Sequence, residues 1–341
     1  MSETTAPVPP QNFLGRITPL LPGLALAAGL AAVSVPIPHL LGIKALSPLI
    51  VAMVLGIAIR NTAGFLPAAH PGIAFSLKRV LRFAIILLGF QLTLTELDQI
   101  GLSGIAVVVA TLSATFVFTK FMGRLLGVDR QLAELIAAGT SVCGASAVIA
   151  CNTVTRGSDE DVAYAVACVT IFGTLSMIFM PMLAAPLGLV SQSYGIWVGA
   201  SVHEVAQAVG AGFALDDHAG QIGTVAKLGR VILLAPLILS LGAIAARRAE
   251  EASTARPPMP WFVFGFIAVM LVNSAVKVPE AVSHQIVMVT SFLLAMALAA
   301  MGLETDVRKL RLKGLRPLAL GAIAWLFIVG FALMMVKALV A

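Results

Sequence analysis

Long apolar runs separated by short polar segments dominate the chain. A membrane-crossing helix needs about 20 apolar residues, and backbone groups in lipid must bond within their own segment, which favours helices. The pattern therefore predicts an all-α polytopic membrane protein, with a disordered tail over 1–17 and a single transmembrane domain over 18–341. About eleven helices are expected, at 18–34, 46–60, 80–93, 103–122, 131–152, 161–185, 194–213, 219–246, 260–276, 284–303 and 317–338.

Composition excludes most other classes of protein. The 341 residues are 59% apolar and only 11% charged, with a mean hydropathy of +1.01, whereas soluble domains carry about 25% charged residues. A soluble enzyme, a disordered chain, a disulfide scaffold and a nucleic-acid binder are therefore excluded. The three cysteines lie inside apolar segments and fit no metal site, and no P-loop or HExxH pattern is present. No metal and no cofactor are expected.

The basic residues predict an orientation in the membrane. With the N-terminus in the cytoplasm, sixteen of the 22 Lys and Arg residues fall in cytoplasmic loops or tails and four fall on the opposite side. The positive-inside rule associates such an excess with the cytoplasmic face. The pattern thus predicts the N-terminus inside and the C-terminus outside.

Three short matches indicate internal repeats. Lys78–Leu88 resembles Lys227–Leu234, which lies five predicted spans later. Because five is an odd number, the two segments would cross the membrane in opposite directions, as an inverted repeat requires. This favoured interpretation makes 46–185 the first repeat and 194–341 the second, with 18–34 as an extra helix. Competing matches link 95–104 to 305–314, and 139–142 (Gly-Thr-Ser-Val) to 199–202 (Gly-Ala-Ser-Val). The last pair lies two predicted spans apart and would run parallel.

A run of glycines and small polar residues interrupts the predicted helix at 131–152. One interpretation is a broken helix whose second half aims free N–H groups at a ligand. The other is close helix packing through small residues. The first interpretation gives five candidate substrate-binding residues, which are Thr140, Ser141, Cys143, Gly144 and Ser146.

Between Val162 and Leu215, Glu204 is the only acidic or basic residue and His203 is the only histidine, and both lie in the predicted helix at 194–213. A carboxylate at the bilayer centre is costly, and intramembrane ionisable groups usually serve function. Together with Gln207, which lies within one helical turn, these residues are candidates for proton coupling or ligand binding. The alternative is a structural polar cluster that joins helices.

Lys227 and Arg230 lie near the middle of the predicted helix at 219–246 and share one face. Because one acid, Glu204, cannot balance two cations, the remaining positive charge favours an anionic substrate, with Arg230 as a planar fork for an oxyanion. The alternative is that Lys227 pairs with Glu204 while Arg230 caps carbonyls of the broken helix. Weaker candidates near span ends are Gln91, Thr93, Asn273 and Glu304.

The motifs at 139–147, 201–207 and 227–236 resemble the YeiH-type sulfate exporter family, in the same order along the chain. Gly229 departs from the pattern, since Thr is expected there. The resemblance implies a multi-pass protein of the bacterial inner membrane. A more distant resemblance to the bile acid:sodium symporter superfamily implies a core domain with crossing discontinuous helices that moves against a panel domain. Sulfate as a substrate is implied only by the resemblance to this family.

These observations predict a secondary transporter of a small anion, with sulfate or sulfite as candidates, working by alternating access with proton coupling through Glu204 and His203. The expected partners are the substrate anion, H+ or Na+, and the lipid bilayer, and a homodimer is left open. Rival hypotheses are a sodium-coupled organic-anion carrier, an anion channel, and a membrane enzyme using Cys143 and His203. No enzyme constellation is found within one segment, so an enzyme is not expected.

Overall fold

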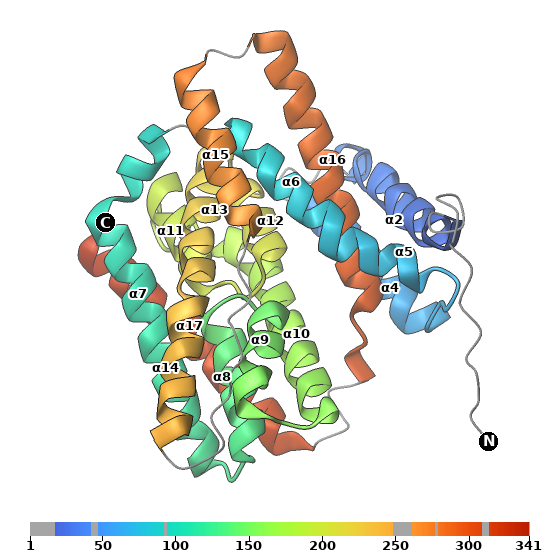
Figure 1. Cartoon of the computed structure of the whole chain (residues 1–341). Coiled ribbons are helices and arrows are strands. Elements are labelled where there is room, and N and C mark those ends of the chain that lie inside the picture. Colours follow the sequence, from blue (N-terminus) through green and yellow to red (C-terminus); the bar gives the residue numbers. More distant parts are fainter. Residues whose placement is uncertain are drawn as a thin grey trace, which may run out of the picture.

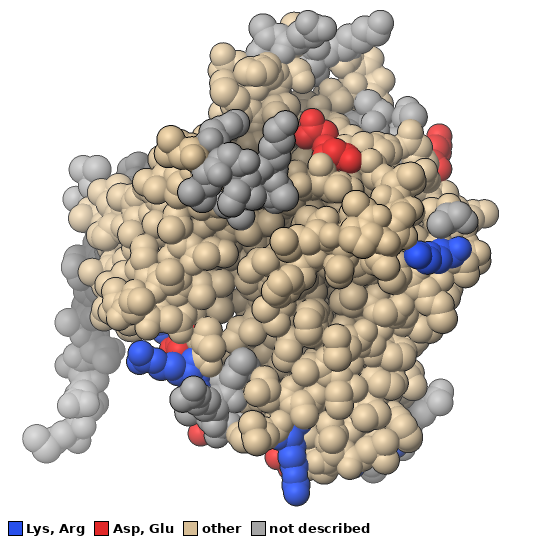
Figure 2. All heavy atoms as spheres, turned by 180° about the vertical axis from the view of Figure 1, so that it is seen from behind, with Lys and Arg blue, Asp and Glu red and all other residues tan. Residues whose placement is uncertain are grey.

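The computed structural model describes residues 18–41, 47–91, 94–247, 261–276, 279–308 and 314–340. The predicted tail and Thr93 lie outside these residues. All regular elements in the described ranges are helices. Five are long and apolar enough to cross a membrane, and four shorter apolar helices accompany them. On the face shown in Figure 2, charged side chains gather mainly toward the two ends, with a wide uncharged belt between them.

One group of helices, here called the panel bundle, packs around the long helix α16 (Figure 1). Gly56 and Gly302 bring the backbones of α4 and α16 into contact, since a Cβ on Gly56 would lie 3.0 Å from the Gly302 Cα. Such close crossings through small residues are typical of membrane helices. The bundle consists of α2 (Leu21–Ser34), α3 (Ile37–Leu41), α4 (Pro48–Ala63), α5 (His70–Phe75), η2 (Ser76–Val80), α6 (Leu81–Leu88), η3 (Gly89–Gln91), α15 (Trp261–Ala275) and α16 (Glu280–Glu304).

The other group, the core bundle, contains the sequence-predicted site. Its helices pack on one another far more extensively than on the panel bundle. They are α7 (Leu94–Leu125), α8 (Arg130–Ser141), α9 (Ala145–Thr155), α10 (Asp159–Leu183), α11 (Ser191–Ser201), α12 (Val205–Phe213), α13 (Asp217–Ile232), α14 (Leu234–Arg247) and α17 (Leu315–Leu339).

Helices α8 and α9 form a hairpin instead of one helix that crosses the bundle. Gly157, just after α9, lies against Gln131 in the first turn of α8, and the Thr155 hydroxyl donates to the Glu134 carboxylate at 2.8 Å. At 1.5 Å per residue the 12 residues of α8 span about 18 Å. This is little more than half of the about 30 Å of hydrocarbon that a crossing helix spans, and both ends of the hairpin lie on one side.

Helices α11 and α12 form a second hairpin that enters from the opposite end (Figure 1). The hydroxyl of Tyr194, in the first turn of α11, donates to the carbonyl of Ala211, near the end of α12, at 3.0 Å. Between the two hairpins α10 runs the full length of the core bundle, and its 25 residues span about 37 Å. The turns of the two hairpins therefore approach each other from opposite sides.

These hairpins correct part of the sequence prediction. Residues 131–152 are discontinuous, as expected, and residues 194–213, predicted as one helix, are discontinuous too. Each segment doubles back and neither crosses the bundle. The match of 139–142 to 199–202 relates the two hairpin turns, which enter from opposite ends and so do not run parallel. The five-helix repeat would instead align the hairpin α8–α9 with α16, which is unbroken from Glu280 to Glu304.

Candidate functional site

The turns of the two hairpins repeat one local structure. Ser141 and Ser201 are the last residues of α8 and α11, and each side chain donates to the carbonyl four residues earlier at 2.6 Å. Each helix then breaks at a valine, Val142 or Val202. Because the breaks precede α9 and α12, the carboxyl ends of two half-helices and the amino ends of two others meet at one place, here called the crossing.

Lys227 joins the two turns. Its ammonium group is completely buried and donates to the carbonyls of Val142 and Val202 at 2.7 Å each and of His203 at 2.6 Å. An ammonium has three donors, so all of them are used. Positive charge at the carboxyl end of a helix is stabilising because the last carbonyls point outward there.

Arg230 lies one turn further along α13 and binds the same helix ends. Its guanidinium donates to the carbonyls of Ser141 at 3.1 Å and Thr140 at 2.9 Å in the first hairpin. In the second hairpin it donates to Gly199 at 3.2 Å and Val202 at 3.0 Å. A guanidinium has five N–H groups, so one is left. Both cations thus act as carbonyl caps, the interpretation that the sequence had offered as the alternative for Arg230.

Glu204 occupies the amino ends of the other two half-helices. Its carboxylate accepts the amide of Ala145, the first residue of α9, at 2.5 Å, and also the amide of Gln207 in α12. Gly144 permits this contact, because a Cβ there would collide with the Glu204 carboxylate and its φ of 67° is unfavourable for other residues. No ion pair joins Glu204 to Lys227 among the described residues.

Gln207 completes the second turn by a reciprocal cap and anchors it to α10. Its side-chain oxygen accepts the Glu204 amide at 3.2 Å, while its nitrogen donates to the Thr170 carbonyl at 2.9 Å and the Thr174 hydroxyl at 3.2 Å. Gly173 leaves room for this amide. Gln207 therefore positions Glu204.

His203 is completely buried, and neither ring nitrogen has a hydrogen-bond partner within the described residues. Unpaired buried polar groups are rare and costly. The ring lies within electrostatic range of Lys227 and Arg230. In the crossing, the N–H donor and the nitrogen acceptor of the neutral His203 ring are therefore both available to a ligand.

The crossing is closed on most sides. The thiol of Cys143 is 3% exposed and Glu204 is 8% exposed, whereas Ser146, in the first turn of α9, is exposed. Access is therefore greatest beside the amino end of α9. Cys143 and His203 sit at equivalent positions of the two turns.

A half-buried ion pair that the sequence analysis missed holds the first hairpin to α7. The ammonium of Lys120 contacts the Glu134 carboxylate at 2.5 Å, and the same carboxylate accepts the Thr155 hydroxyl. Lys120 lies near the end of the predicted helix at 103–122 and had been counted only among the cytoplasmic basic residues. Glu134, an acid inside an apolar segment, was the signal that could have revealed the pair.

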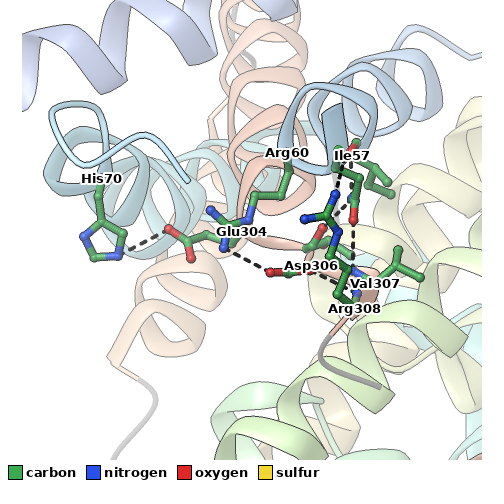
Figure 3. Close-up of polar contacts among 9 residues, drawn as sticks. Ile57, Arg60, His70, Glu304, Asp306, Val307 and Arg308 are labelled. Carbon is green, nitrogen blue, oxygen red and sulfur yellow. Dashed lines mark hydrogen bonds and ion pairs between the residues drawn. The ribbon is translucent and has the colours of Figure 1, made fainter. Parts of the chain in front are cut away.

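The weaker candidates lie away from the crossing. The Gln91 carbonyl accepts the Gln221 side chain at 2.8 Å, and Asn273 is in α15 of the panel bundle. Glu304 contacts His70 at 3.5 Å, next to the Arg60–Asp306 pair at 3.4 Å (Figure 3). This panel cluster ties the ends of α4 and α16 together. Thr93 lies outside the described residues.

Gly229, the one departure from the family pattern, faces open space. A Cβ at this position would meet no atom within 4 Å. A threonine there would therefore direct its hydroxyl away from the crossing, although Lys227 and Arg230 flank it in sequence. The departure leaves the crossing unchanged.

Comparison with known proteins gives relatives over nearly the whole chain. Residues 22–321 match the family described as conserved hypothetical protein 698. The UPF0324 inner membrane protein YeiH of Salmonella typhi is 38% identical, covering 95% of this chain and 96% of that protein. The UPF0324 membrane protein PA5383 of Pseudomonas aeruginosa is 38% identical over 93% and 94%, and YeiH of Escherichia coli K12 is 37% identical over 92% and 93%. No solved structure matches the chain.

Proposed function

The chain belongs to the family described as conserved hypothetical protein 698 and is a multi-pass inner-membrane protein, and from that premise we propose that it is a secondary transporter of a small anion. Sulfate and sulfite are the first candidates, moved outward by alternating access of the crossing. The single observation that carries the proposal is the meeting of two opposed hairpins around buried charges. Irregular backbone at membrane depth is tolerated only where it is buried in protein or lines a pathway, and such half-helix ends form the binding sites of many transporters.

The charge at the crossing supports an anion as the substrate. Lys227 and Arg230 carry two positive charges, Glu204 carries one negative charge when ionised, and two helix amino ends offset two carboxyl ends. One positive charge is left in a buried region. The amino ends of α9 and α12, with the remaining Arg230 donor and the Ser146 hydroxyl, are the groups that would bind the anion. Lys227 and most of Arg230 bind carbonyls of the two turns and so hold the hairpins, with these amino ends, in place.

Two rival functions receive less support. A sodium ion would need backbone carbonyls at the broken helices, but the carbonyls of Val142, Val202 and His203 already accept from Lys227. A channel would need a continuous pathway, whereas the turns are packed closely enough that Ser141, Ser201 and Gln207 are completely buried.

The division into two bundles supports a movement of one against the other. Contacts between them are few and include the Thr174 hydroxyl, which lies 3.9 Å from the Met53 sulfur. Both hairpins and both cations belong to the core bundle, so the crossing can move as a unit past the panel bundle. This is the arrangement that alternating access requires.

A thermal-shift experiment on the purified protein tests the proposal. Ligands that bind only the folded state raise its apparent stability, by about 2.7 kcal/mol at a concentration 100 times Kd. Sulfate, sulfite, thiosulfate, phosphate and small organic acids would each be added as sodium salts at two pH values, with sodium chloride at equal ionic strength as the control. Stabilisation by one or more oxyanions beyond the chloride control is expected. Equal melting temperatures with every anion would refute the proposal.

A further inference from the structure

The Glu204 carboxylate is itself an anion bound at the amino ends of two half-helices. It receives the Ala145 amide from one hairpin and the Gln207 amide from its own. These are the outward-pointing N–H groups that an oxyanion would use. An external anion and the ionised carboxylate therefore compete for the same donors.

Resting on the proposed function, we infer that Glu204 is a built-in competitor of the substrate, and that the anion binds only as Glu204 takes up a proton and leaves the helix ends. The proton comes from water and is bound by a carboxylate oxygen of Glu204. The Ala145 and Gln207 amides then donate to the oxyanion. One proton is taken up for each anion bound, and the two travel together.

The charges identify the class of anion that suits this exchange. With Glu204 ionised, the three side chains sum to one positive charge, and with Glu204 protonated they sum to two. A doubly charged oxyanion then brings the crossing to neutrality, whereas a dianion beside ionised Glu204 would leave a negative charge in a region of low dielectric, which is costly. Sulfate, and sulfite in its doubly charged form, meet this requirement.

Apart from the imidazole of His203, the groups around Glu204 supply no alternative proton acceptor. The α8–α9 hairpin contributes the Cys143 thiol, α13 contributes Lys227 and Arg230, and α10 contributes only hydroxyl and carbonyl groups of Thr170 and Thr174. His203, with both ring nitrogens unpaired among the described residues, can bind the incoming oxyanion or the protonated carboxyl. Its place next to Glu204 is a second observation that points to a ligand at this position.

Isothermal titration with sodium sulfate in buffers of different ionisation enthalpy measures the proton count. At about pH 8, where an ordinary carboxyl is ionised, wild-type protein should take up about one proton per sulfate. Glu204→Gln, which keeps an oxygen acceptor but cannot gain this proton, should bind sulfate with none. Asp159→Asn, on the exposed first turn of α10, is the matched control and should keep the wild-type count. Wild-type binding without proton uptake, or undiminished uptake by Glu204→Gln, would overturn the inference.

A second measurement uses the wild-type protein alone and covers the case in which Glu204→Gln does not fold. Linkage requires sulfate affinity to fall about tenfold per pH unit over the range in which one proton is taken up. Sulfate affinity that is equal from pH 6 to 9 would overturn the inference. Failure of sulfate and all other oxyanions to bind at any pH would instead refute the proposed function itself, so the two failures are distinguishable.

Discussion

The carboxylate of Glu204, in the turn of one hairpin, accepts the backbone amide of Ala145, in the turn of the other, at 2.5 Å. The two hairpins enter the core bundle from opposite ends, and the two residues are 59 positions apart in the chain. Since Lys227 binds the carbonyl ends of the same turns, the crossing is held by one acid at its amino ends and two bases at its carboxyl ends. Removing any of these charges should therefore affect both hairpins at once.

Lys227→Met should destabilise the folded protein by about 3–5 kcal/mol, because the buried carbonyls of Val142 and His203 lose their donor and that of Val202 keeps only Arg230. The measurement is the free energy of unfolding in detergent, followed by tryptophan fluorescence. Lys337→Met, on the exposed last turn of α17, is the control and should change it by less than about 0.5 kcal/mol. Equal stability of the two variants would show that Lys227 does not hold the turns.

Gly144→Ala should abolish sulfate binding, because the new methyl group fills the place beside the Ala145 amide that the Glu204 carboxylate now occupies and that the oxyanion would take, and the positive φ costs about 1–2 kcal/mol. Gly229→Ala is the matched control, since its methyl group meets nothing, and replacing glycine within a helix should stabilise the protein by about 0.5–1 kcal/mol. Sulfate titrations of both variants check this. Normal sulfate affinity in Gly144→Ala would contradict the assigned geometry.

Ser146→Cys should react with a charged, membrane-impermeant thiol reagent, and sulfate should slow the reaction. Ser146 is exposed at the amino end of α9, whereas Cys143, Cys151 and Cys168 are buried. Wild-type protein is the control and should label far more slowly. Labelling of Ser146→Cys at the wild-type rate would mean that water does not reach the crossing from this side.

A cross-link between Met53→Cys in α4 and Thr174→Cys in α10 should stop transport while leaving sulfate binding intact, because it joins the two bundles where they touch. Reduction of the cross-link should restore flux, and each single-cysteine variant treated with the same oxidant is the control. Full flux in the cross-linked protein would argue against a movement of the core bundle past the panel bundle.

The sequence predicted helices, a break within residues 139–146 and the clustering of Glu204, Lys227 and Arg230, because these follow from composition and from the cost of charge in lipid. It could not distinguish a hairpin from a kinked crossing helix. The 12 residues of α8 and the 11 of α9 together have the length of one crossing helix, and the contact of Thr155 with Glu134 is needed to show that the chain turns back.

The partners of the cations were also beyond the sequence. Carbonyl groups are present at every residue, so nothing in the pattern marks those of Val142 and Val202 as the acceptors for Lys227. Because α8 and α9 form a hairpin, Arg156 lies at the same end of the core bundle as Gln131 and Leu135. The charge pattern places other basic residues at this end as well. Two segments that were counted as crossing helices are hairpins. Because there are two of them, the direction in which most of the other helices cross is unchanged, and the charge pattern therefore agreed with a helix count that was too large.

Sulfate counterflow in proteoliposomes tests the central claim most directly. Vesicles loaded with unlabelled sulfate are diluted into a trace of radiolabelled sulfate, with wild-type protein, Gly144→Ala or no protein. Wild-type vesicles should accumulate label transiently above the external level, and Gly144→Ala vesicles should resemble those without protein. Wild-type vesicles that take up no more label than empty ones, or Gly144→Ala vesicles that match wild type, would contradict transport of the anion through the crossing of the two hairpins.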